Sequence, residues 1–310
     1  MNSRTLIASV LVAALALAAC SSDTASTQTG VAGGQTPQTV LQAAASIDAW
    51  GSILSQLGGT HVKTTSIITN PDTDPHDYEP TPADGRVIAE SRLFVENGIG
   101  YDAWAAKAIA ANPSDERTVI DVGELVGVAD GGNPHRWYSP ADVESVADAI
   151  TAALKKLDPA DAAYFDGQRT AFENTGLVDY HRLINEIKTK YAGTPVGASE
   201  SIFAPLSDAL GLDLLTPASF LKAISEGTDP TAADKTLIDS QISGNQIKVY
   251  VFNSQNSTPD VSAQVDASKK AGIPVAAVTE TLFPQGATFQ DWQSAQLKTI
   301  EEALHQATGK

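Results

Sequence analysis

The sequence predicts an α/β protein with two lobes, each built on a parallel sheet, joined by one long connecting helix. Short β-rich runs alternate with helical stretches in two separate series, and a polar helical stretch lies between the series. Such alternation is typical of parallel sheets covered by helices. We therefore expect an N-terminal lobe at 41–157, the connecting helix at 158–192 and a C-terminal lobe at 193–310.

The first twenty residues have the pattern of a lipoprotein signal peptide. A short basic start is followed by the apolar run Leu6 to Ala19, which ends at Leu17-Ala18-Ala19-Cys20. The Cys20 thiol is the predicted site of lipidation after cleavage. An uncleaved membrane helix is the alternative, but the run is shorter than the roughly 20 residues that span a bilayer. We expect a protein anchored to the outer face of the cell membrane through a flexible tether at 21–40, rich in Ser, Thr and Gly.

The N-terminal lobe contains three strand candidates, with helical patterns before and between them. These candidates are Val62–Thr69, Leu93–Asn97 and Thr118–Val122. Three helix starts share one local sequence, in which a capping side chain precedes a proline and an aspartate follows two residues later. They begin at Thr81, Ser139 and Asp158. A side-chain oxygen, a proline at the first helical position and an early acid all favour a helix N-terminus.

The polar stretch from Pro159 to Tyr191 predicts the connecting helix, although Gly176 in its middle leaves a helix-turn-helix as the alternative. The C-terminal lobe then repeats the alternation. Its strand candidates are Pro195–Glu200, Leu214–Thr216, Val249–Ser254 and Pro274–Glu280, and its expected helices lie near 202–210, 231–243 and 261–271.

Charge and cysteine content exclude several classes of function. With 37 acidic against 20 basic residues the net charge is -17, so nucleic acid would be repelled, whereas a cationic ligand is compatible. The only cysteine is Cys20, so the folded part has neither disulfides nor thiolate metal ligands. A folded part of about 270 residues buries enough apolar surface to be stable without disulfides.

Two histidines occupy similar positions in the sequence. His76 lies in the loop that follows the strand candidate at 62–69, and His135 lies in the segment Gly132-Asn-Pro-His135-Arg-Trp-Tyr-Ser139. Each follows a proline and precedes a predicted helix start by four or five residues. Imidazole is the commonest nitrogen ligand for manganese and zinc, and loops fixed beside helix starts would hold its orientation. Simple exposure to solvent is the alternative for either residue taken alone.

Two carboxylates end predicted strands of the second series. Glu200 ends Pro-Val-Gly-Ala-Ser-Glu, and Glu280 ends Pro-Val-Ala-Ala-Val-Thr-Glu. Ligands of open α/β sheets bind beyond the carboxyl ends of the strands, so acids at these positions are candidate ligands. Capping of the next helix or contact with water is the alternative for each.

Together, two neutral imidazoles and two carboxylates would neutralise one divalent cation and provide four coordination bonds without cysteine. The four residues are 59, 65 and 80 positions apart, which matches no compact metal motif. Two alternatives remain open at this point: an extracytoplasmic metal-dependent hydrolase, and a receptor for a metal chelate or an organic solute.

Several segments together resemble one known family, the metal-binding lipoproteins of manganese and zinc ABC transporters (cluster A-I solute-binding proteins), over nearly all of the chain after the tether. The segments are Asp74-Pro-His76-Asp-Tyr-Glu-Pro-Thr-Pro-Ala-Asp84, Val95-Glu-Asn-Gly-Ile-Gly-Tyr-Asp-Ala-Trp104, Pro134-His135-Arg-Trp137, Ser199-Glu200-Ser-Ile-Phe203 and Val278-Thr-Glu280-Thr. The resemblance implies a monomeric receptor, not an enzyme, that delivers one divalent ion to an ABC transporter permease. His76 and His135 would come from the N-terminal lobe, and Glu200 and Glu280 from the C-terminal lobe.

Two departures from the family leave the cargo open between manganese and zinc. Many zinc-binding members carry a histidine-rich loop after the first histidine segment, but residues 105–133 contain no histidine. Many also have a third histidine where this chain has Glu200, and the fourth ligand is more often Asp than Glu280. An oxygen-rich ligand set favours manganese slightly. The remaining histidines, His61, His181 and His305, are expected at the surface, and Trp104 and Trp137 are expected to pack around the site loops.

Overall fold

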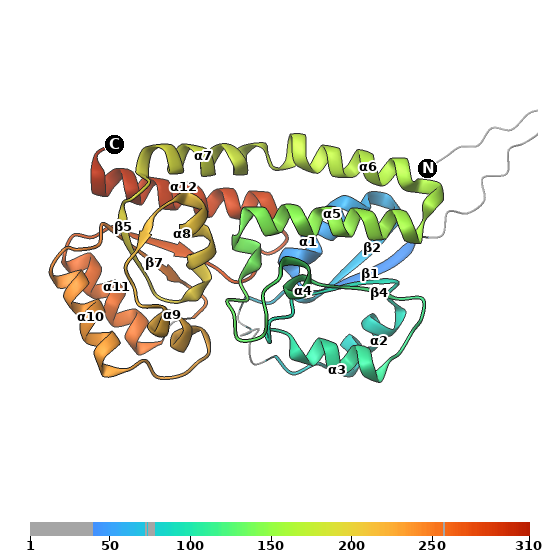
Figure 1. Ribbon diagram of the computed structural model, residues 1–310, viewed down its shortest axis with the longest axis horizontal. Coiled ribbons are helices and arrows are strands. Elements are labelled where there is room, and N and C mark those ends of the chain that lie inside the picture. Colours follow the sequence, from blue (N-terminus) through green and yellow to red (C-terminus); the bar gives the residue numbers. More distant parts are fainter. Residues whose placement is uncertain (1–39, 72, 74–77, 257) are drawn as a thin grey trace, which may run out of the picture. The chain divides into compact units, whose positions relative to one another are not determined.

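The computed structural model describes residues 40–71, 73, 78–256 and 258–310 and confirms the predicted fold class. Two four-stranded parallel sheets, each flanked by helices, are bridged by a long helical segment (Figure 1). The predicted signal peptide with Cys20, nearly all of the tether and the candidate ligand His76 lie outside the described residues.

The N-terminal sheet has the strand order β2-β1-β3-β4, and every pair of neighbours is parallel. Its strands are β1 (Leu41–Ile47), β2 (Val62–Ile68), β3 (Leu93–Glu96) and β4 (Thr118–Asp121). Its helices are α1 (Asp48–Gly58), α2 (Pro82–Glu90), α3 (Ala103–Ala111), α4 (Val122–Val126) and α5 (Pro140–Leu157).

The central strand β1 corrects the sequence analysis, which expected only helical patterns before Val62. Three of its seven residues are alanine, which locally favours a helix. The strand is nevertheless buried from Ala43 to Ile47 and lies between β2 and β3. Small side chains fit a central strand that is covered on both faces, so tertiary packing overrides the local preference.

The C-terminal sheet repeats the same topology with the order β6-β5-β7-β8, again parallel throughout. Its strands are β5 (Pro195–Ala198), β6 (Asp213–Leu214), β7 (Val249–Asn253) and β8 (Val275–Val278). Its helices are α8 (Ala204–Leu210), α9 (Ala218–Ser225), α10 (Ala232–Ser243), α11 (Pro259–Lys270) and α12 (Phe289–Thr308). The predicted strand at 214–216 is thus displaced and only two residues long.

The connecting segment is helical except for a bend at Leu177, which favours one long, irregular helix over the helix-turn-helix. After a short 3-10 turn (Pro159–Asp161), α6 (Ala162–Ala171) passes through a π-helical turn (Phe172–Gly176) into α7 (Val178–Tyr191). The Leu177 N–H donates to Phe172 O at 2.8 Å, so the backbone ladder continues through the π turn. Gly176 therefore lies in an irregular turn of one helix and does not break it.

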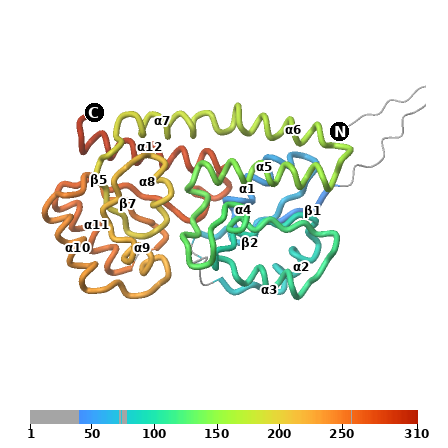
Figure 2. The backbone as a smooth tube through the Cα atoms, in the orientation of Figure 1, coloured from blue at the N-terminus to red at the C-terminus, as the bar shows by residue number. Residues whose placement is uncertain are grey.

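One apolar cluster contains side chains from both lobes and from the connecting helix. Its large aromatic members include Trp50, Tyr138, Phe172, Tyr180 and Trp292. The helices α6 and α7 run along both lobes, with α5 against α6 and α12 against α7 (Figures 1 and 2). Each large apolar side chain stabilises by roughly 1.5–3 kcal/mol when fully buried, so this seam joins the lobes firmly. The lobes belong to a single compact unit.

Of the three predicted helix caps, only one forms as expected. The Thr81 side chain accepts from the Asp84 N–H, and the Asp84 side chain accepts from the Thr81 N–H, which is a capping box. Helical turns also begin after Ser139 and Asp158, but neither side chain caps its helix. Asp142 instead accepts a hydrogen bond from Arg136. Within the described residues, no helix combines the length and apolar character needed to cross a membrane.

Candidate metal centre

His135 is a fully buried imidazole at the end of the loop between α4 and α5. It is the residue before a 3-10 turn (Arg136–Tyr138), and its exposed fraction is 0%. Asn97, the residue after β3, fixes this loop, because its Nδ2 donates to Pro134 O at 2.9 Å. The ring of Trp137 meets the imidazole edge-on at 5.4 Å between centroids. Trp137 and Trp104 are both buried, as the sequence analysis expected.

Glu200 and Glu280 lie two residues beyond the carboxyl ends of β5 and β8. These strands flank β7, and all three are parallel, so their carboxyl ends meet at one edge of the sheet. Both side chains are buried, with exposed fractions of 2% for Glu200 and 5% for Glu280. The predicted position of these acids at strand ends, on two strands separated only by β7, is therefore what brings them together.

The structure brings together three of the four candidate ligands. One ligand atom each from His135, Glu200 and Glu280 lies within 4.8 Å of the other two. His135 Nε2 is 2.6 Å from Glu280 Oε1, the distance of a charge-assisted hydrogen bond that holds one proton between the two atoms. A divalent cation bound to both atoms would replace this proton. The fourth candidate, His76, lies outside the described residues.

Neutral amides hold the Glu200 carboxylate and the Glu280 backbone. The end of β7 supplies Asn253, whose Nδ2 donates to Glu200 Oε1 at 2.6 Å, and the following loop supplies Asn256, whose Nδ2 donates to Glu200 Oε2 at 2.7 Å. In the same loop, Gln255 Oε1 accepts the Glu280 N–H at 2.7 Å. These amides orient the Glu200 carboxylate and the Glu280 backbone without adding positive charge of their own.

The Glu280 segment is also anchored to the N-terminal lobe. The Tyr138 hydroxyl donates to Thr279 O at 2.8 Å, and the carboxylate of Asp48, in the first turn of α1, accepts the Leu282 N–H at 3.1 Å. Burial raises the pKa of Asp48 to about 7. Burial also raises the pKa of Glu96 to about 7, with a smaller contribution from the charges of Asp102 and Asp121. Burial thus favours the neutral, protonated form of these two carboxyl groups at the carboxyl edge of the N-terminal sheet.

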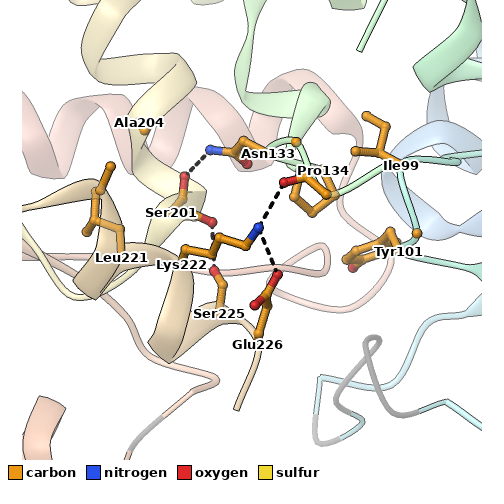
Figure 3. A pocket seen from close by; sticks show the side chains of 14 residues that line it. Ile99, Tyr101, Asn133, Pro134, Ser201, Ala204, Leu221, Lys222, Ser225 and Glu226 are labelled. Carbon is orange, nitrogen blue, oxygen red and sulfur yellow. Dashed lines mark hydrogen bonds and ion pairs between the residues drawn. The ribbon is translucent and has the colours of Figure 1, made fainter. Parts of the chain in front are cut away.

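A cavity of about 380 Å³ opens beside the centre, between the loop at 131–134 and helix α9 (Figure 3). None of the three described candidate ligands lines it. The cavity borders Asn133 and Ser201, which contact the Nδ1 side of His135, whereas Nε2 faces Glu280. It is therefore adjacent to the imidazole and distinct from the point where the donor atoms meet.

A second group with metal-ligand chemistry lies between α5, which contains Glu144, and the connecting helix, which contains Glu173 and His181. Ligand atoms of Glu144, Glu173 and His181 also lie within 4.8 Å of one another, and all three residues are partly exposed. Arg169 joins this group: its guanidinium is 2.5 Å from Glu144 Oε2 and 3.1 Å from Glu173 Oε2. A cation already compensates these carboxylates, so the group is an ion-pair network that fastens α5 to the connecting helix.

Two of the three remaining histidines, expected at the surface, are only partly exposed and have specific partners. His181 takes part in this network, at 3.2 Å from Glu144 Oε1. His61 stacks on Tyr164 with 3.7 Å between ring centroids and pairs with Asp161 at 2.8 Å, and only 15% of its side chain is exposed. His305 is exposed, as expected.

Sequence reasoning missed the amides that support the centre. Asn133, Asn253, Gln255 and Asn256 are too ordinary in loops to attract notice as residue types. One signal was available: Asn253 ends β7, the strand between the two acid-bearing strands, and so shares their carboxyl edge. Comparing the three strand ends together would have identified it.

Comparisons with known proteins agree with this architecture. Residues 44–303 match the family model described as zinc-uptake complex component A, periplasmic. The chain is 25% identical over 214 residues to the manganese-binding lipoprotein MntA of Halalkalibacterium halodurans, covering 66% of this chain and 67% of that protein. It is also 25% identical over 315 residues to the metal ABC transporter substrate-binding lipoprotein ScbA of Streptococcus cristatus, covering 94% of this chain and 95% of that protein.

Solved structures share the fold. A manganese-bound mutant of the periplasmic metal binding protein from Candidatus Liberibacter asiaticus superposes with a TM-score of 0.73 at 19% sequence identity. The match covers 85% of this chain and 99% of that protein.

Proposed function

Since the chain belongs to the family of the periplasmic zinc-uptake component A, we propose that it is an extracytoplasmic receptor for one divalent metal ion, manganese or zinc. In this proposal, the receptor captures the ion between its two lobes and delivers it to the permease of an ABC importer. One of the relatives described above is a manganese-binding lipoprotein, and the other is a metal ABC transporter substrate-binding lipoprotein.

One observation carries the proposal: His135, Glu200 and Glu280 meet within 4.8 Å although 65 and 80 residues separate them along the chain. The imidazole comes from the N-terminal lobe and the carboxylates from the C-terminal lobe. All three are buried, which is costly for charged groups unless a partner compensates them. A divalent cation is such a partner, because two carboxylates neutralise it.

We propose His76 as the fourth ligand, on its sequence context alone. Two imidazoles and two carboxylates then give a complete set of protein donors. A closed set suits capture of a cargo. A metal-dependent hydrolase needs an open position for water and substrate, so the burial of the donors favours the receptor over the enzyme.

For the cargo, the donors favour manganese slightly over zinc. Carboxylate oxygens suit manganese, and imidazole suits zinc, so two of each leave both metals possible. Zinc would bind such a site more tightly in a test tube, because affinity for a given site rises from manganese to zinc. Growth of a deletion strain under separate manganese and zinc limitation would distinguish them, because only limitation of the physiological cargo should produce a defect that the gene repairs.

We further propose that Cys20 carries a lipid anchor and that the receptor acts as a monomer on the outer face of the cell membrane. A lipid group on the N-terminal cysteine would keep the receptor close to its permease while the tether allows it to move. Mass spectrometry of the membrane fraction should detect an N-terminal diacylglyceryl cysteine at position 20, and a mature chain that begins elsewhere would contradict the anchor.

The direct test of the receptor is metal content. The purified chain should retain about one equivalent of manganese or zinc after gel filtration, measured by elemental analysis. His76→Ala should retain much less while keeping its fold by circular dichroism, because loop ligands contribute more to the centre than to the cores. His305→Ala, which removes an exposed histidine far along α12, is the matched control and should retain the metal. Equal metal content in the wild type and His76→Ala would rule out that ligand.

A further inference from the structure

Asn133 contacts both lobes at the centre. It lies in the loop before His135, in the N-terminal lobe, and lines the cavity between the lobes (Figure 3). Its Nδ2 donates to Ser201 O of the C-terminal lobe at 2.7 Å. Its Oδ1 is 2.9 Å from His135 Nδ1 and 3.1 Å from the His135 backbone N–H.

The chemistry of these partners determines which way the amide points. Ser201 O is a carbonyl oxygen and can only accept, so the amide nitrogen must face it. The amide oxygen therefore faces His135 and accepts a hydrogen bond from Nδ1–H. With the other ring proton on Nδ1, Nε2 faces the Glu200 and Glu280 carboxylates and can bind a cation once the cation replaces the proton between Nε2 and Glu280 Oε1.

Ser201 directly follows Glu200 in the chain, so the Asn133 side chain also holds the C-terminal lobe next to a candidate ligand. Fixing the Ser201 carbonyl limits how far the Glu200 backbone can move away from His135. Lys222 makes the comparable contact further out, where its Nζ donates to Gly131 O at 3.1 Å. That lysine is 54% exposed and pairs with Glu226, and it contacts none of the described candidate ligands.

We propose that Asn133 is a positioning residue that sets the orientation of His135 and holds Glu200 in place beside it. This inference rests on the proposed function, because it assigns the residue a role in metal binding. One side chain thereby links the geometry of an imidazole ligand to the contact between the lobes. A supporting residue of this kind typically changes metal affinity by about 10- to 100-fold when it is removed.

Three variants distinguish the hydrogen bonds of Asn133 to His135 and to Ser201 O from a general loss of contact between the lobes. Asn133→Ala removes the bond to Ser201 O and both bonds from His135. Asn133→Asp keeps an oxygen that accepts from His135 Nδ1 but cannot donate to Ser201 O. Lys222→Ala removes a contact between the lobes that does not touch His135 and serves as the matched control.

Two measurements on the full chain are needed: zinc affinity by competition with a chromophoric chelator, and the visible absorption spectrum of the cobalt(II) complex, which reports ligand geometry. Asn133→Ala should bind zinc about 10- to 100-fold more weakly and change the cobalt spectrum. Asn133→Asp should keep the wild-type spectrum but bind zinc more weakly than the wild type. Lys222→Ala should match the wild type in both.

Any other result would contradict a specific part of the role proposed for Asn133. Wild-type affinity and spectrum in Asn133→Ala would refute the positioning role, as would an equal loss in Lys222→Ala. If Asn133→Asp changed the spectrum as much as Asn133→Ala, the accepting oxygen would not be what orients His135. Thermal unfolding of the metal-free variants identifies any that does not fold; if Asn133→Ala fails, Asn133→Asp carries the test. A wild-type chain that binds neither zinc nor cobalt would instead refute the proposed function.

Discussion

In the described part of the chain, two places hold ligand atoms of one imidazole and two carboxylates within 4.8 Å of one another, and they differ in what surrounds them. At the junction of the lobes, His135, Glu200 and Glu280 are buried, and amides hold the Glu200 carboxylate. Between α5 and the connecting helix, Glu144, Glu173 and His181 are partly exposed, and Arg169 pairs with both carboxylates.

The comparison shows that residue types and spacing do not define a metal centre by themselves. The guanidinium of Arg169 is a permanent positive charge that partly offsets its carboxylates and joins α5 to the connecting helix. The amides at the junction orient the Glu200 carboxylate and, being neutral, add no positive charge of their own. Burial strengthens this difference, because an uncompensated charge is far more costly inside a protein than at its surface.

The largest expected effect is the loss of stabilisation by zinc, which should follow a substitution in the Glu200 group but not one in the Glu144 group. At a free zinc concentration 1,000 times the Kd, binding should raise the free energy of unfolding of the wild type by about 4 kcal/mol. Glu200→Gln should lose nearly all of this stabilisation, because it removes a ligand charge and keeps the shape. Thermal or chemical unfolding with and without zinc measures the difference.

The matched control is Glu144→Gln in α5. It makes the same chemical change in the other group and should keep the full zinc stabilisation. If Glu144→Gln lost the zinc response and Glu200→Gln kept it, the assignment of the two groups would be reversed.

A smaller effect tests the raised pKa of Asp48, whose side chain contacts the Glu280 segment through the Leu282 N–H. Burial raises the pKa of Asp48 from its ordinary 3.8 to about 7, so the folded protein holds a proton that the unfolded chain releases at lower pH. The stability from this proton is fully present below pH 3.8 and is lost as the pH rises through about 7. Asp48→Asn keeps an acceptor for the Leu282 N–H but does not ionise. Its free energy of unfolding should therefore gain about 2 kcal/mol on the wild type between pH 5 and pH 7.

Urea unfolding of both proteins without metal at several pH values provides the measurement. Parallel pH profiles for the wild type and Asp48→Asn would mean that Asp48 ionises normally in the folded protein.

The smallest effect concerns Arg169 itself. Arg169→Met should lower the free energy of unfolding by about 1 kcal/mol, because its ion pairs are partly exposed. The same change should make the network responsive to zinc, since two carboxylates and His181 then lack their cation. Extra zinc stabilisation in Arg169→Met, absent from the double variant Arg169→Met with Glu144→Gln, would support the role of the countercharge. No extra response would show that exposure, and not Arg169, keeps metal away.

The sequence alone predicted the fold class and the position of Glu200 and Glu280 at strand ends. Both depend on local properties: the alternation of β-rich and helical runs, and the place of each acid within its run. Sequence reasoning missed β1, where alanines favour a helix locally and only burial between two strands makes a strand stable. It separated His135, in a loop, from His181, in a helix, but it did not foresee the ion-pair network around His181, because tertiary contacts alone bring Arg169 and Glu144 there. Asn133 was missed because its partners also come from tertiary contacts, whereas Asn253 could have been found from its position at the end of β7.

The central claim is that one ion binds where the lobes meet, and a crystal structure of the metal-loaded protein with anomalous scattering from manganese or zinc tests it most directly. The account predicts a single strong anomalous peak about 2.0–2.2 Å from His135 Nε2 and from carboxylate oxygens of Glu200 and Glu280 if the metal is zinc, with His76 completing the set. A principal peak beside Glu144, Glu173 and His181, or an ion at the junction without Glu200 and Glu280 as ligands, would contradict it.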